Sequence, residues 1–439
     1  MKRDLMSRLD AWKQSPGRKP LVLSGARQVG KTWILKEFGA TRYGNTAYLS
    51  FDKTPNAAAL FAGDFSLPRV LAGLQALCGV AITPGDTLII LDEIQVCPDA
   101  LRCLKYWQED APGYHVAAAG PLIGLAALAG TGYPVGKTNS LTLYPMGFQE
   151  FLAAVGEEKL AEVLDLGDGV LLNALAESFS WRLKEYCFVG GFPAVVKAFA
   201  ETRSYAAARD KQTEILTGYG RDFGKHAPKA QVPRIRAVWQ ALPVQLAKAD
   251  KRFMASEVAS GSARKTRARD LRDPCEWLEA AGLIYRAWNV SKPELPLAAY
   301  RNHVFKVYGV DVGLLAAQLR LAARTLLDGN RVFTEFNGAL AGQFAQQELR
   351  AVAGVDPYYW TAANSRAEVD FLLELPAGAV PLEVKAEQNL RAKSLQLYRE
   401  RFLPAVAVRT SLTGFRRDDD LLNLPLFAVG KIGDFYKNN

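Results

Sequence analysis

Residues 25–32, GARQVGKT, place two glycines, a lysine and a threonine at the spacing G-x-x-x-x-G-K-[ST]. Glycines let the backbone curl until its N–H groups point inward at a phosphate. Lys31 then reaches the outer phosphates, and the Thr32 hydroxyl is a ligand for Mg²⁺. An apolar run precedes the loop and a helical pattern follows it, so a helix adds its positive N-terminal end. We expect ATP or ADP to contact Gly25, Ala26, Arg27, Gln28, Val29, Gly30, Lys31, Thr32 and Trp33.

A second chemical motif lies further along the chain. DTLIILDEIQ, at 86–95, runs four apolar residues into Asp92 and Glu93. A buried strand of an α/β sheet delivers side chains at its C-terminal end, where such sheets bind ligands. Asp92 would hold Mg²⁺ through water, and Glu93 would polarise the attacking water. The alternative is a strand that merely ends in acidic residues, but the phosphate loop before it favours the catalytic interpretation.

Another glycine-lysine-threonine sequence, GTGYPVGKT at 130–138, does not meet the same requirements. Thr131 occupies the position that needs the first glycine. Pro134 lacks the N–H that a phosphate cradle would use. We therefore expect a loop here.

These motifs need a sheet to position them. Alternating and apolar runs at 45–52, 114–120 and 139–145 predict three further strands. With the strands before the phosphate loop and before Asp92, they make a five-stranded, mainly parallel sheet with helices between. The most apolar stretch, 116–130, is too short and too broken by glycine and proline to span a membrane, so we expect a buried strand, turn and helix.

Five stretches carry a family resemblance: GARQVGKT, LSFD, LIILDEIQ, YPVGKTNSLTLYPMGFQEFL and FVGGFPAVV. They resemble, in order and over almost the whole chain, the prokaryotic AAA+ ATPases with a C-terminal domain of unknown function. The resemblance implies an AAA+ core at 1–150 and a small helical lid at 151–230. The family usually has a small polar sensor of the γ-phosphate after the glycine that ends the fourth strand, but this chain has Gly120–Pro121. Proline offers no side-chain donor and no N–H, so we expect slow hydrolysis.

The expected lid is mostly helical, with a break at 190–193, GGFP. GYGRDFGKH, at 218–226, resembles a family stretch with an Arg–Asp pair. Arg221 is therefore a candidate arginine finger that acts on a neighbouring subunit, which would require a homo-oligomer. The alternative is a salt-bridged surface arginine.

Residues 231–300 predict a helix, a short helix, a basic helix and a β-wing, the order of a winged helix, which the resemblance also implies. Residues 225–272 hold twelve Lys or Arg and three Asp or Glu, so the chain's net charge of +9 is concentrated here. Such a segment can bind the phosphates of DNA or RNA. A solvated helix face, or a surface that docks on an acidic part of the same protein, is the alternative. Five of the cations would cluster near one helix: Arg264, Lys265, Arg267, Arg269 and Arg272.

The C-terminal part contains AEVDFLLELPAGAVPLEVK at 367–385, two apolar runs separated by PAGA, which predicts a β-hairpin. Paired strands can bring Asp370, Glu383 and Lys385 together, because side chains alternate between faces. Carboxylates in that arrangement bind a divalent metal, and a lysine beside them helps to activate water against a phosphate. Helices are expected at 334–349 and 390–402, the first with Glu335 near its start.

This order resembles the PD-(D/E)xK nuclease core, and the C-terminal domain of the same family is similar to that fold. The resemblance implies a nuclease-like domain at 301–439. E-x-K on a strand is common by chance, and nuclease-like folds also occur without cleavage. The implied metal and catalytic set is Glu335, Asp370, Glu383 and Lys385, with Asp370 and Glu383 as metal ligands and Glu368 further out.

Composition limits the remaining possibilities. The 439 residues contain five cysteines, none in a CxxC pair, and three histidines, so we expect reduced thiols and no structural zinc site. The N-terminus, MKRDLMSRLDAWKQS, lacks the apolar region of a signal peptide. We therefore expect a cytoplasmic protein that does not enter a membrane.

The sequence as a whole predicts a multidomain α/β protein: a P-loop AAA+ core, a helical lid, a winged helix and a PD-(D/E)xK-like domain. One hypothesis is a slow Mg²⁺-dependent ATPase coupled to nucleic-acid binding and a nuclease-like domain. The other is a nucleotide-dependent switch or scaffold that binds a protein, with the C-terminal carboxylates in a structural role.

Overall fold

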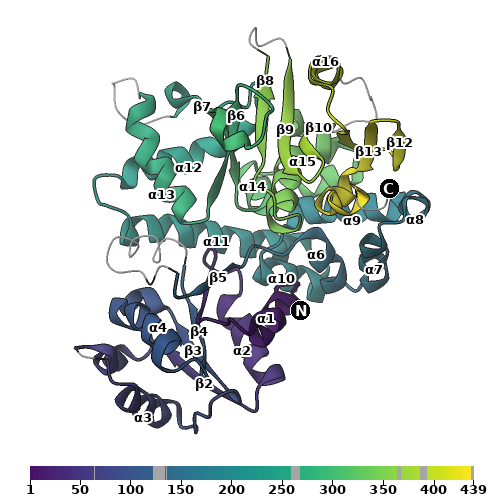
Figure 1. Ribbon diagram of the computed structural model, residues 1–439. Helices are drawn as coiled ribbons and strands as arrows, with labels where there is room; N and C mark the ends of the chain where they lie inside the picture. The colour runs from purple at the N-terminus through teal and green to yellow at the C-terminus, as the bar shows by residue number, and fades with distance from the viewer. Residues whose placement is uncertain are drawn as a thin grey trace. The chain divides into compact units, whose positions relative to one another are not determined.

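A computed structural model gives the structure of the protein (Figure 1). It describes residues 1–63, 65–121, 134, 136–258, 267–362, 367–385 and 393–436, and within these it leaves out the side chains of residues 268, 327, 335–337 and 436. The described chain divides into two compact units. The smaller unit is residues 2–144 with 280–282, and the larger is residue 1, 145–279 and 283–439. We describe each unit by itself.

The smaller unit alternates strands and helices. Its elements are α1 (Leu5–Gln14), β1 (Leu21–Ser24), α2 (Lys31–Arg42), β2 (Asn45–Ser50), η1 (Pro55–Phe61), α3 (Leu67–Cys78), β3 (Thr87–Asp92), η2 (Ile94–Val96), α4 (Pro98–Asp110), β4 (His115–Ala119) and β5 (Asn139–Thr142).

The expected five-stranded sheet is confirmed, with the order β2-β3-β4-β1-β5 and every pair parallel. Helices α3 and α4 lie on one side of it, and α1 and α2 on the other (Figure 1). Ile89 and Leu91 belong to the core cluster that α3 and α4 cover. The intervening Leu88 and Ile90 are also fully buried, so β3 is apolar on both faces, as the strands of a parallel α/β sheet are.

The larger unit begins with helices. They are α6 (Phe148–Ala154), α7 (Glu158–Leu166), α8 (Gly169–Ala174), α9 (Ala176–Val189), α10 (Pro193–Thr202), α11 (Tyr205–His226), α12 (Val232–Leu246), η3 (Ala255–Glu257), η4 (Ala268–Leu271) and α13 (Arg272–Ala280). The break at 190–193 falls between α9 and α10. There the buried Asp311 carboxylate accepts the Gly191 N–H over 2.7 Å. It also caps the helix α14 (Val312–Gln318) by accepting the Leu314 N–H over 2.9 Å.

An eight-stranded mixed sheet follows, with the order β12-β13-β11-β10-β9-β8-β6-β7. Its elements are β6 (Ile284–Val290), η5 (Leu297–Tyr300), β7 (Arg301–Gly309), α14 (Val312–Gln318), η6 (Ala323–Leu327), α15 (Arg331–Ala351), β8 (Tyr358–Thr361), β9 (Glu368–Leu375), β10 (Gly378–Val384), α16 (Lys393–Phe402), β11 (Ala407–Ser411), β12 (Arg416–Asp418), β13 (Leu421–Pro425), η7 (Leu426–Lys431) and η8 (Asp434–Tyr436). The expected hairpin is present as β9 and β10, which pair antiparallel. The two expected helices correspond to α15 and α16.

Helix α15 joins the helical part of this unit to its sheet through buried polar side chains. Gln343 pairs with both the N–H and the carbonyl of Gly309, each over 2.7 Å. Gln347 accepts the Val312 N–H over 2.9 Å, and Glu348 accepts the Phe148 N–H over 2.9 Å. Buried backbone groups need such partners. Elements far apart in sequence are therefore fastened to one helix.

Two features differ from the winged-helix prediction. The strand at the expected wing, β6, belongs to the eight-stranded sheet, because it pairs with β8 as well as with β7. The expected basic helix is α13, where Arg272 is accompanied by three carboxylates, Asp273, Glu276 and Glu279. Arg264 and Lys265 lie outside the described residues.

Candidate functional site

Backbone geometry shapes the phosphate loop between β1 and α2. Gly25 and Gly30 have φ angles of 153° and 97°, which side chains rarely adopt. A Cβ atom on Gly25 would also lie 2.3 Å from the Leu143 carbonyl oxygen. Both positions therefore require glycine. Arg3 braces the loop from the N-terminus, because its guanidinium donates to the Val29 carbonyl over 3.0 Å and to the Tyr144 carbonyl over 2.7 Å.

Lys31, the first residue of α2, is buried against its own loop. Its ammonium donates to the carbonyls of Gly25 over 3.1 Å and Ala26 over 2.8 Å. Burial lowers the pKa of Lys31 to about 8, although the nearby charges of Glu93 and Asp92 partly oppose this. The cation therefore lies inside the loop, paired with two of the loop's own carbonyls. Of its neighbours, Ala26 and Val29 are buried, whereas Gln28 and Trp33 are exposed.

Asp92 is the meeting point of three elements. Its Oδ2 atom accepts the Thr32 hydroxyl of α2 over 2.8 Å and the Tyr48 hydroxyl of β2 over 2.9 Å. Sequence reasoning paired Thr32 with Asp92 but missed Tyr48. A signal existed, because Tyr48 lies near the C-terminal end of the strand that pairs with β3. Burial, with the Asp92 charge, raises the pKa of Tyr48 to about 12, so the phenol remains a donor at neutral pH.

Glu93 follows Asp92 in the left-handed backbone region, with φ of 52°. Its Oε2 atom accepts the Gln95 amide over 2.5 Å. A non-glycine residue with positive φ at the end of a strand is uncommon and marks a constrained position. Pro121, after β4, is buried and offers no donor at the position where the resembling family has its phosphate sensor.

The residues of this site fit ATP and Mg²⁺. Two glycines with positive φ shape the loop backbone, and Lys31 supplies a buried cation. A hydroxyl and a carboxylate 2.8 Å apart are oxygen donors of the kind that Mg²⁺ prefers.

A second group of charges lies in the larger unit, where β9 and β10 bring Asp370, Glu383 and Lys385 together. Asp370 Oδ2 accepts the Val384 N–H over 2.9 Å, and the Lys385 ammonium donates to Glu383 Oε1 over 2.6 Å. Burial, followed by the Asp370 charge, raises the pKa of Glu383 to about 7. Glu335 lies on α15, but its side chain is outside the described residues.

Sequence reasoning missed the lysines that meet these carboxylates. Lys306 of β7 is fully buried, and its Nζ atom lies 2.5 Å from Glu368 Oε1 and 3.9 Å from Asp370 Oδ1. Burial lowers the pKa of Lys306, but Glu368 and Asp370 together raise it by more than burial lowers it. The net pKa is therefore above that of an ordinary lysine. Lys251 also faces Asp370, and burial lowers its pKa. No local pattern links positions 251, 306 and 370.

The oxygen donors of Asp370 and Glu383 decide whether this second group of charges can hold a metal ion. Glu383 Oε2 is buried and has no hydrogen-bond partner in the described structure, which suits a cation between Glu383 and Asp370. Within the part of the chain that the structure describes, however, no three His, Cys, Asp or Glu side chains gather closely enough to hold a metal. Two carboxylates are the donors that can be assigned.

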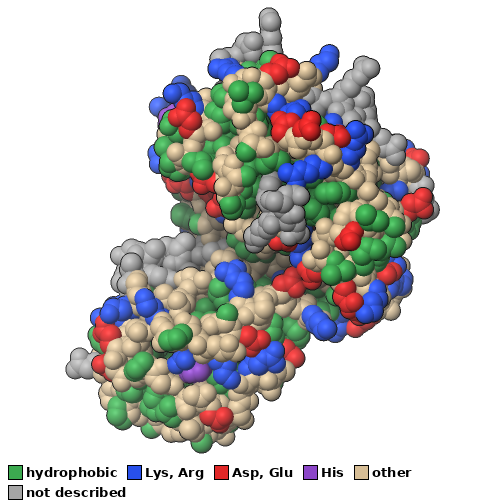
Figure 2. Space-filling view, turned by 45° about the vertical axis from the view of Figure 1, so that its right-hand side comes forward, with side chains coloured by type: hydrophobic (Ala, Val, Ile, Leu, Met, Phe, Trp, Pro, Cys, Tyr) green, Lys and Arg blue, Asp and Glu red, His purple; other side chains and the backbone are tan. Residues whose placement is uncertain are grey.

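The basic segment 225–272 has its described cations on several elements. Three of its cations are ion-paired: Lys248 with Glu257, Arg252 with Asp250, and Arg272 with Glu276. On the face shown in Figure 2, lysine and arginine side chains are interspersed with aspartate and glutamate. Arg221 of α11 is exposed. Among the described helices, none has the length and apolar character that crossing a bilayer requires.

Comparisons with known proteins agree with the class that the first site defines. Residues 17–152 match the family model described as an AAA domain. The sheet, the phosphate loop and this match make the N-terminal part a P-loop ATPase domain of the AAA type. Residues 180–325 and 337–427 match two domains of unknown function, DUF8612 and DUF4143.

Solved structures with similarity include three archaeal proteins. The Walker-type ATPase PABY2304 of Pyrococcus abyssi is 14% identical, with 72% of this chain and 95% of that chain covered and a TM-score of 0.45. The ORC1 protein of Aeropyrum pernix, solved in complex with DNA, is 14% identical over 75% and 90%, with a TM-score of 0.27. Cdc6p of Pyrobaculum aerophilum is 12% identical over 73% and 93%, with a TM-score of 0.28. No curated protein sequence matches the chain.

Proposed function

We propose that this protein binds ATP with Mg²⁺ and hydrolyses it slowly. The observation that carries the proposal is the meeting of Thr32 and Asp92 beside a glycine loop that buries Lys31. In this assignment Lys31 contacts the outer phosphates, and Thr32 and Asp92 hold Mg²⁺. Mg²⁺ would neutralise charge on the transferring phosphoryl group. Glu93 orients the attacking water, and Pro121 leaves the γ-phosphate without a sensor side chain.

Phosphate release at saturating ATP and Mg²⁺ tests this proposal. Wild-type protein should turn over below about 1 s⁻¹, the low end for enzymes. Lys31→Ala should abolish ATP binding, whereas Glu93→Gln should bind ATP without turnover. Arg102→Ala, an exposed α4 residue paired with Asp99, is the matched control. Pro121→Ser should raise turnover if the missing sensor limits it. Equal rates in wild-type and Lys31→Ala would defeat the proposal.

For the larger unit, the first candidate function is nucleic-acid binding and metal-dependent cleavage. Asp370 and Glu383 would hold the metal, which would activate water for attack on a phosphodiester. Lys385 would orient that water, and Glu335 would complete the set. The unpartnered Glu383 Oε2 supports this candidate.

The second candidate is a nucleotide-dependent switch that binds a protein and does not cleave. The observation that favours it is the pairing of the carboxylates with lysines, above all the fully buried Lys306. Here the charges hold β7, β9 and β10 together, and a metal would have to displace an ammonium group. ATP turnover would change the state of the switch.

Mn²⁺ binding separates the two candidates. Lys31→Ala protein, whose ATP site is weakened, would be titrated with Mn²⁺ by electron paramagnetic resonance, beside a double variant that also carries Asp370→Ala. A Mn²⁺ site that disappears with Asp370→Ala, together with strand scission lost in the same variant, supports the nuclease. Equal Mn²⁺ binding in both proteins and no scission supports the switch.

A further inference from the structure

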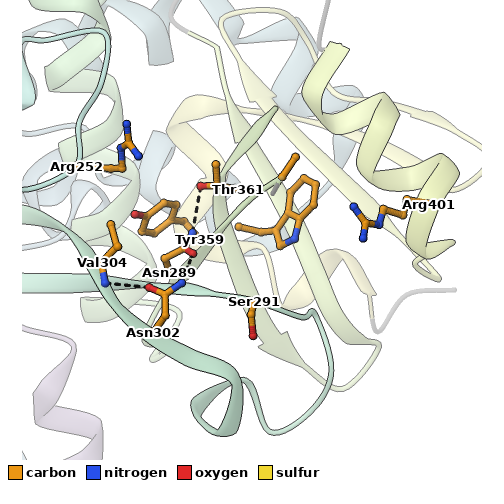
Figure 3. Close-up of a pocket in the computed structure, with 10 residues that line it drawn as sticks. Arg252, Asn289, Ser291, Asn302, Val304, Tyr359, Thr361 and Arg401 are labelled. Atoms are coloured by element: carbon orange, nitrogen blue, oxygen red, sulfur yellow. Dashed lines mark hydrogen bonds between the residues drawn. The ribbon is translucent and has the colours of Figure 1, made fainter. Parts of the chain in front are cut away.

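A pocket of about 310 Å³ opens in the larger unit beside the ends of β6, β7 and β8 (Figure 3). Its size is at the lower end of the range for small-molecule sites. Two arginines, Arg252 and Arg401, contribute to its lining, and no Asp or Glu of the described residues does. The lining therefore favours an anion.

A directed chain of hydrogen bonds crosses the pocket. The Val304 N–H donates to Asn302 over 2.9 Å, the Asn302 amide donates to Asn289 over 2.6 Å, and the Asn289 amide donates to the Thr361 hydroxyl over 3.1 Å (Figure 3). Each asparagine accepts one hydrogen bond through its oxygen and donates the next through its nitrogen. The Thr361 hydroxyl ends the chain with its own hydrogen free, since the described residues give it no acceptor.

Tyr359 forms the wall of the pocket beside this chain. The side chain is fully buried and its hydroxyl has no hydrogen-bond partner in the described part of the chain. The Lys306 ammonium lies 4.5 Å from its ring centroid and is ion-paired with Glu368. Because the Tyr359 side chain has no exposed surface, it forms the wall of the pocket and does not contact a ligand.

The two arginines line the pocket from opposite sides, with the asparagines between them (Figure 3). Arg401 of α16 is exposed and has no ion pair among the described residues. Arg252 is paired with Asp250 through Nε and Nη2, so both N–H groups of Nη1 and the second N–H of Nη2 remain as donors. A ligand with two separated negative groups matches this arrangement better than a single phosphate does.

We propose that the pocket binds one nucleotide unit of a single-stranded nucleic acid, with its two flanking phosphates directed to Arg252 and Arg401. The amides of Asn289 and Asn302 can both donate and accept, as sugar hydroxyls and base edges require. Base stacking is not part of the site, because the rings of Tyr359 and Trp360 are buried. The site is independent of ATP binding at the phosphate loop.

Adenosine 3′,5′-bisphosphate is the smallest probe with both phosphates. Its binding would be measured by calorimetry on full-length Lys31→Ala protein, which keeps the phosphate loop from taking the probe. Arg401→Ala on that background should weaken binding at least tenfold. The exposed Arg416, ion-paired with Asp418 on β12, provides the control Arg416→Ala, which should change binding less than twofold. Because Arg401 and Arg416 are both exposed, neither change should alter the melting temperature.

A 3′-labelled single-stranded oligonucleotide, followed by fluorescence anisotropy, provides the second arm. The bisphosphate should displace it, and Arg401→Ala should weaken it by a similar factor. Equal affinities in Arg401→Ala and its parent would overturn the proposal, as would a strand that binds without being displaced. If AMP and inorganic phosphate compete as well as the bisphosphate does, the pocket takes single phosphates and the strand assignment is wrong.

Discussion

The hydroxyl of Thr32 donates to the carboxylate of Asp92 over 2.8 Å, although sixty positions separate the two residues. The contact joins the start of α2 to the end of β3, so one hydrogen bond links the phosphate loop to the acidic strand. In the proposed assignment the Thr32 oxygen would bind Mg²⁺ with a lone pair while its hydrogen stays hydrogen-bonded to Asp92, which would hold the ion through water. The pair is therefore the point where metal dependence can be measured.

Asp92→Asn should lower the ATPase rate about 100-fold or more, because one preorganised charge at a developing phosphate charge contributes about that much. The Mg²⁺ concentration for half-maximal rate should also rise, since an amide attracts the ion less than a carboxylate. Phosphate release over a Mg²⁺ series measures both. Asp99→Asn, on exposed α4, is the matched control. An unchanged Mg²⁺ dependence in Asp92→Asn would contradict the metal assignment.

ATP binding should take up protons near pH 8. The pKa of Lys31 in the nucleotide-free protein is lowered to about 8, and bound phosphates would raise it. At pH 8 binding should therefore take up roughly half a proton, and affinity should fall as pH rises further. Calorimetry in two buffers of different ionisation enthalpy measures the uptake. Lys31→Arg, which stays charged, should remove it.

The lowered pKa of Lys31 also makes the free energy of unfolding depend on pH. An ordinary lysine, as in the unfolded chain, holds its proton to higher pH than the folded Lys31 does, so the unfolded state binds more protons between the two pKa values. The Lys31 contribution to the free energy of unfolding should therefore increase as pH rises from about 8 toward the ordinary lysine value. Urea unfolding of the nucleotide-free wild-type and Lys31→Met proteins, near pH 8 and near the ordinary lysine pKa, measures the difference in free energy of unfolding between them. A difference that does not change with pH would show that Lys31 is not titrating.

Asp311 should be a larger stability determinant than an exposed cap of the same type. Its carboxylate accepts the Gly191 and Leu314 N–H groups in a fully buried setting. Asp168 accepts the Val170 and Leu171 N–H groups at the start of α8, where the bonds are exposed. Asp311→Ala should lower the free energy of unfolding by about 3 kcal/mol, because buried donors lose their partners. Asp168→Ala should cost about 1 kcal/mol. Equal costs from urea unfolding would contradict this account.

Local patterns predicted the parts whose chemistry is local in sequence. The spacing of Gly25, Gly30 and Lys31, and the apolar run into Asp92, identified the loop and the strand beside it. Alternation along 367–385 identified the β9–β10 hairpin. Each of these signals lies within about ten to twenty residues of chain, the scale on which helix and strand periodicity operates.

The remaining features depend on contacts that no short window contains. Arg3 reaches the carbonyl of Tyr144, Tyr48 reaches Asp92, and Lys306 reaches Glu368. A wing was predicted at β6 because an extended apolar run after a basic helix suits a winged helix. The pairing of β6 with β8, which places them in a larger sheet, joins residues about seventy positions apart.

Lys306 should hold its carboxylates more strongly than Lys385 does. Lys306 is fully buried, whereas the side chain of Lys385 is 27% exposed. Lys306→Met leaves Glu368 and Asp370 without their buried cation, so the free energy of unfolding should fall by about 2–4 kcal/mol. Lys385→Met should cost about 1 kcal/mol, because the Lys385 side chain is itself partly exposed to water, which screens its pairing with Glu383. The double variant Lys306→Met with Glu368→Gln should recover part of the loss, and urea unfolding of wild type, Lys306→Met, Glu368→Gln and the double variant gives the coupling energy. If the double variant loses the sum of the two single costs, Lys306 and Glu368 do not interact, and the lysine pairs cease to support the structural role of this cluster.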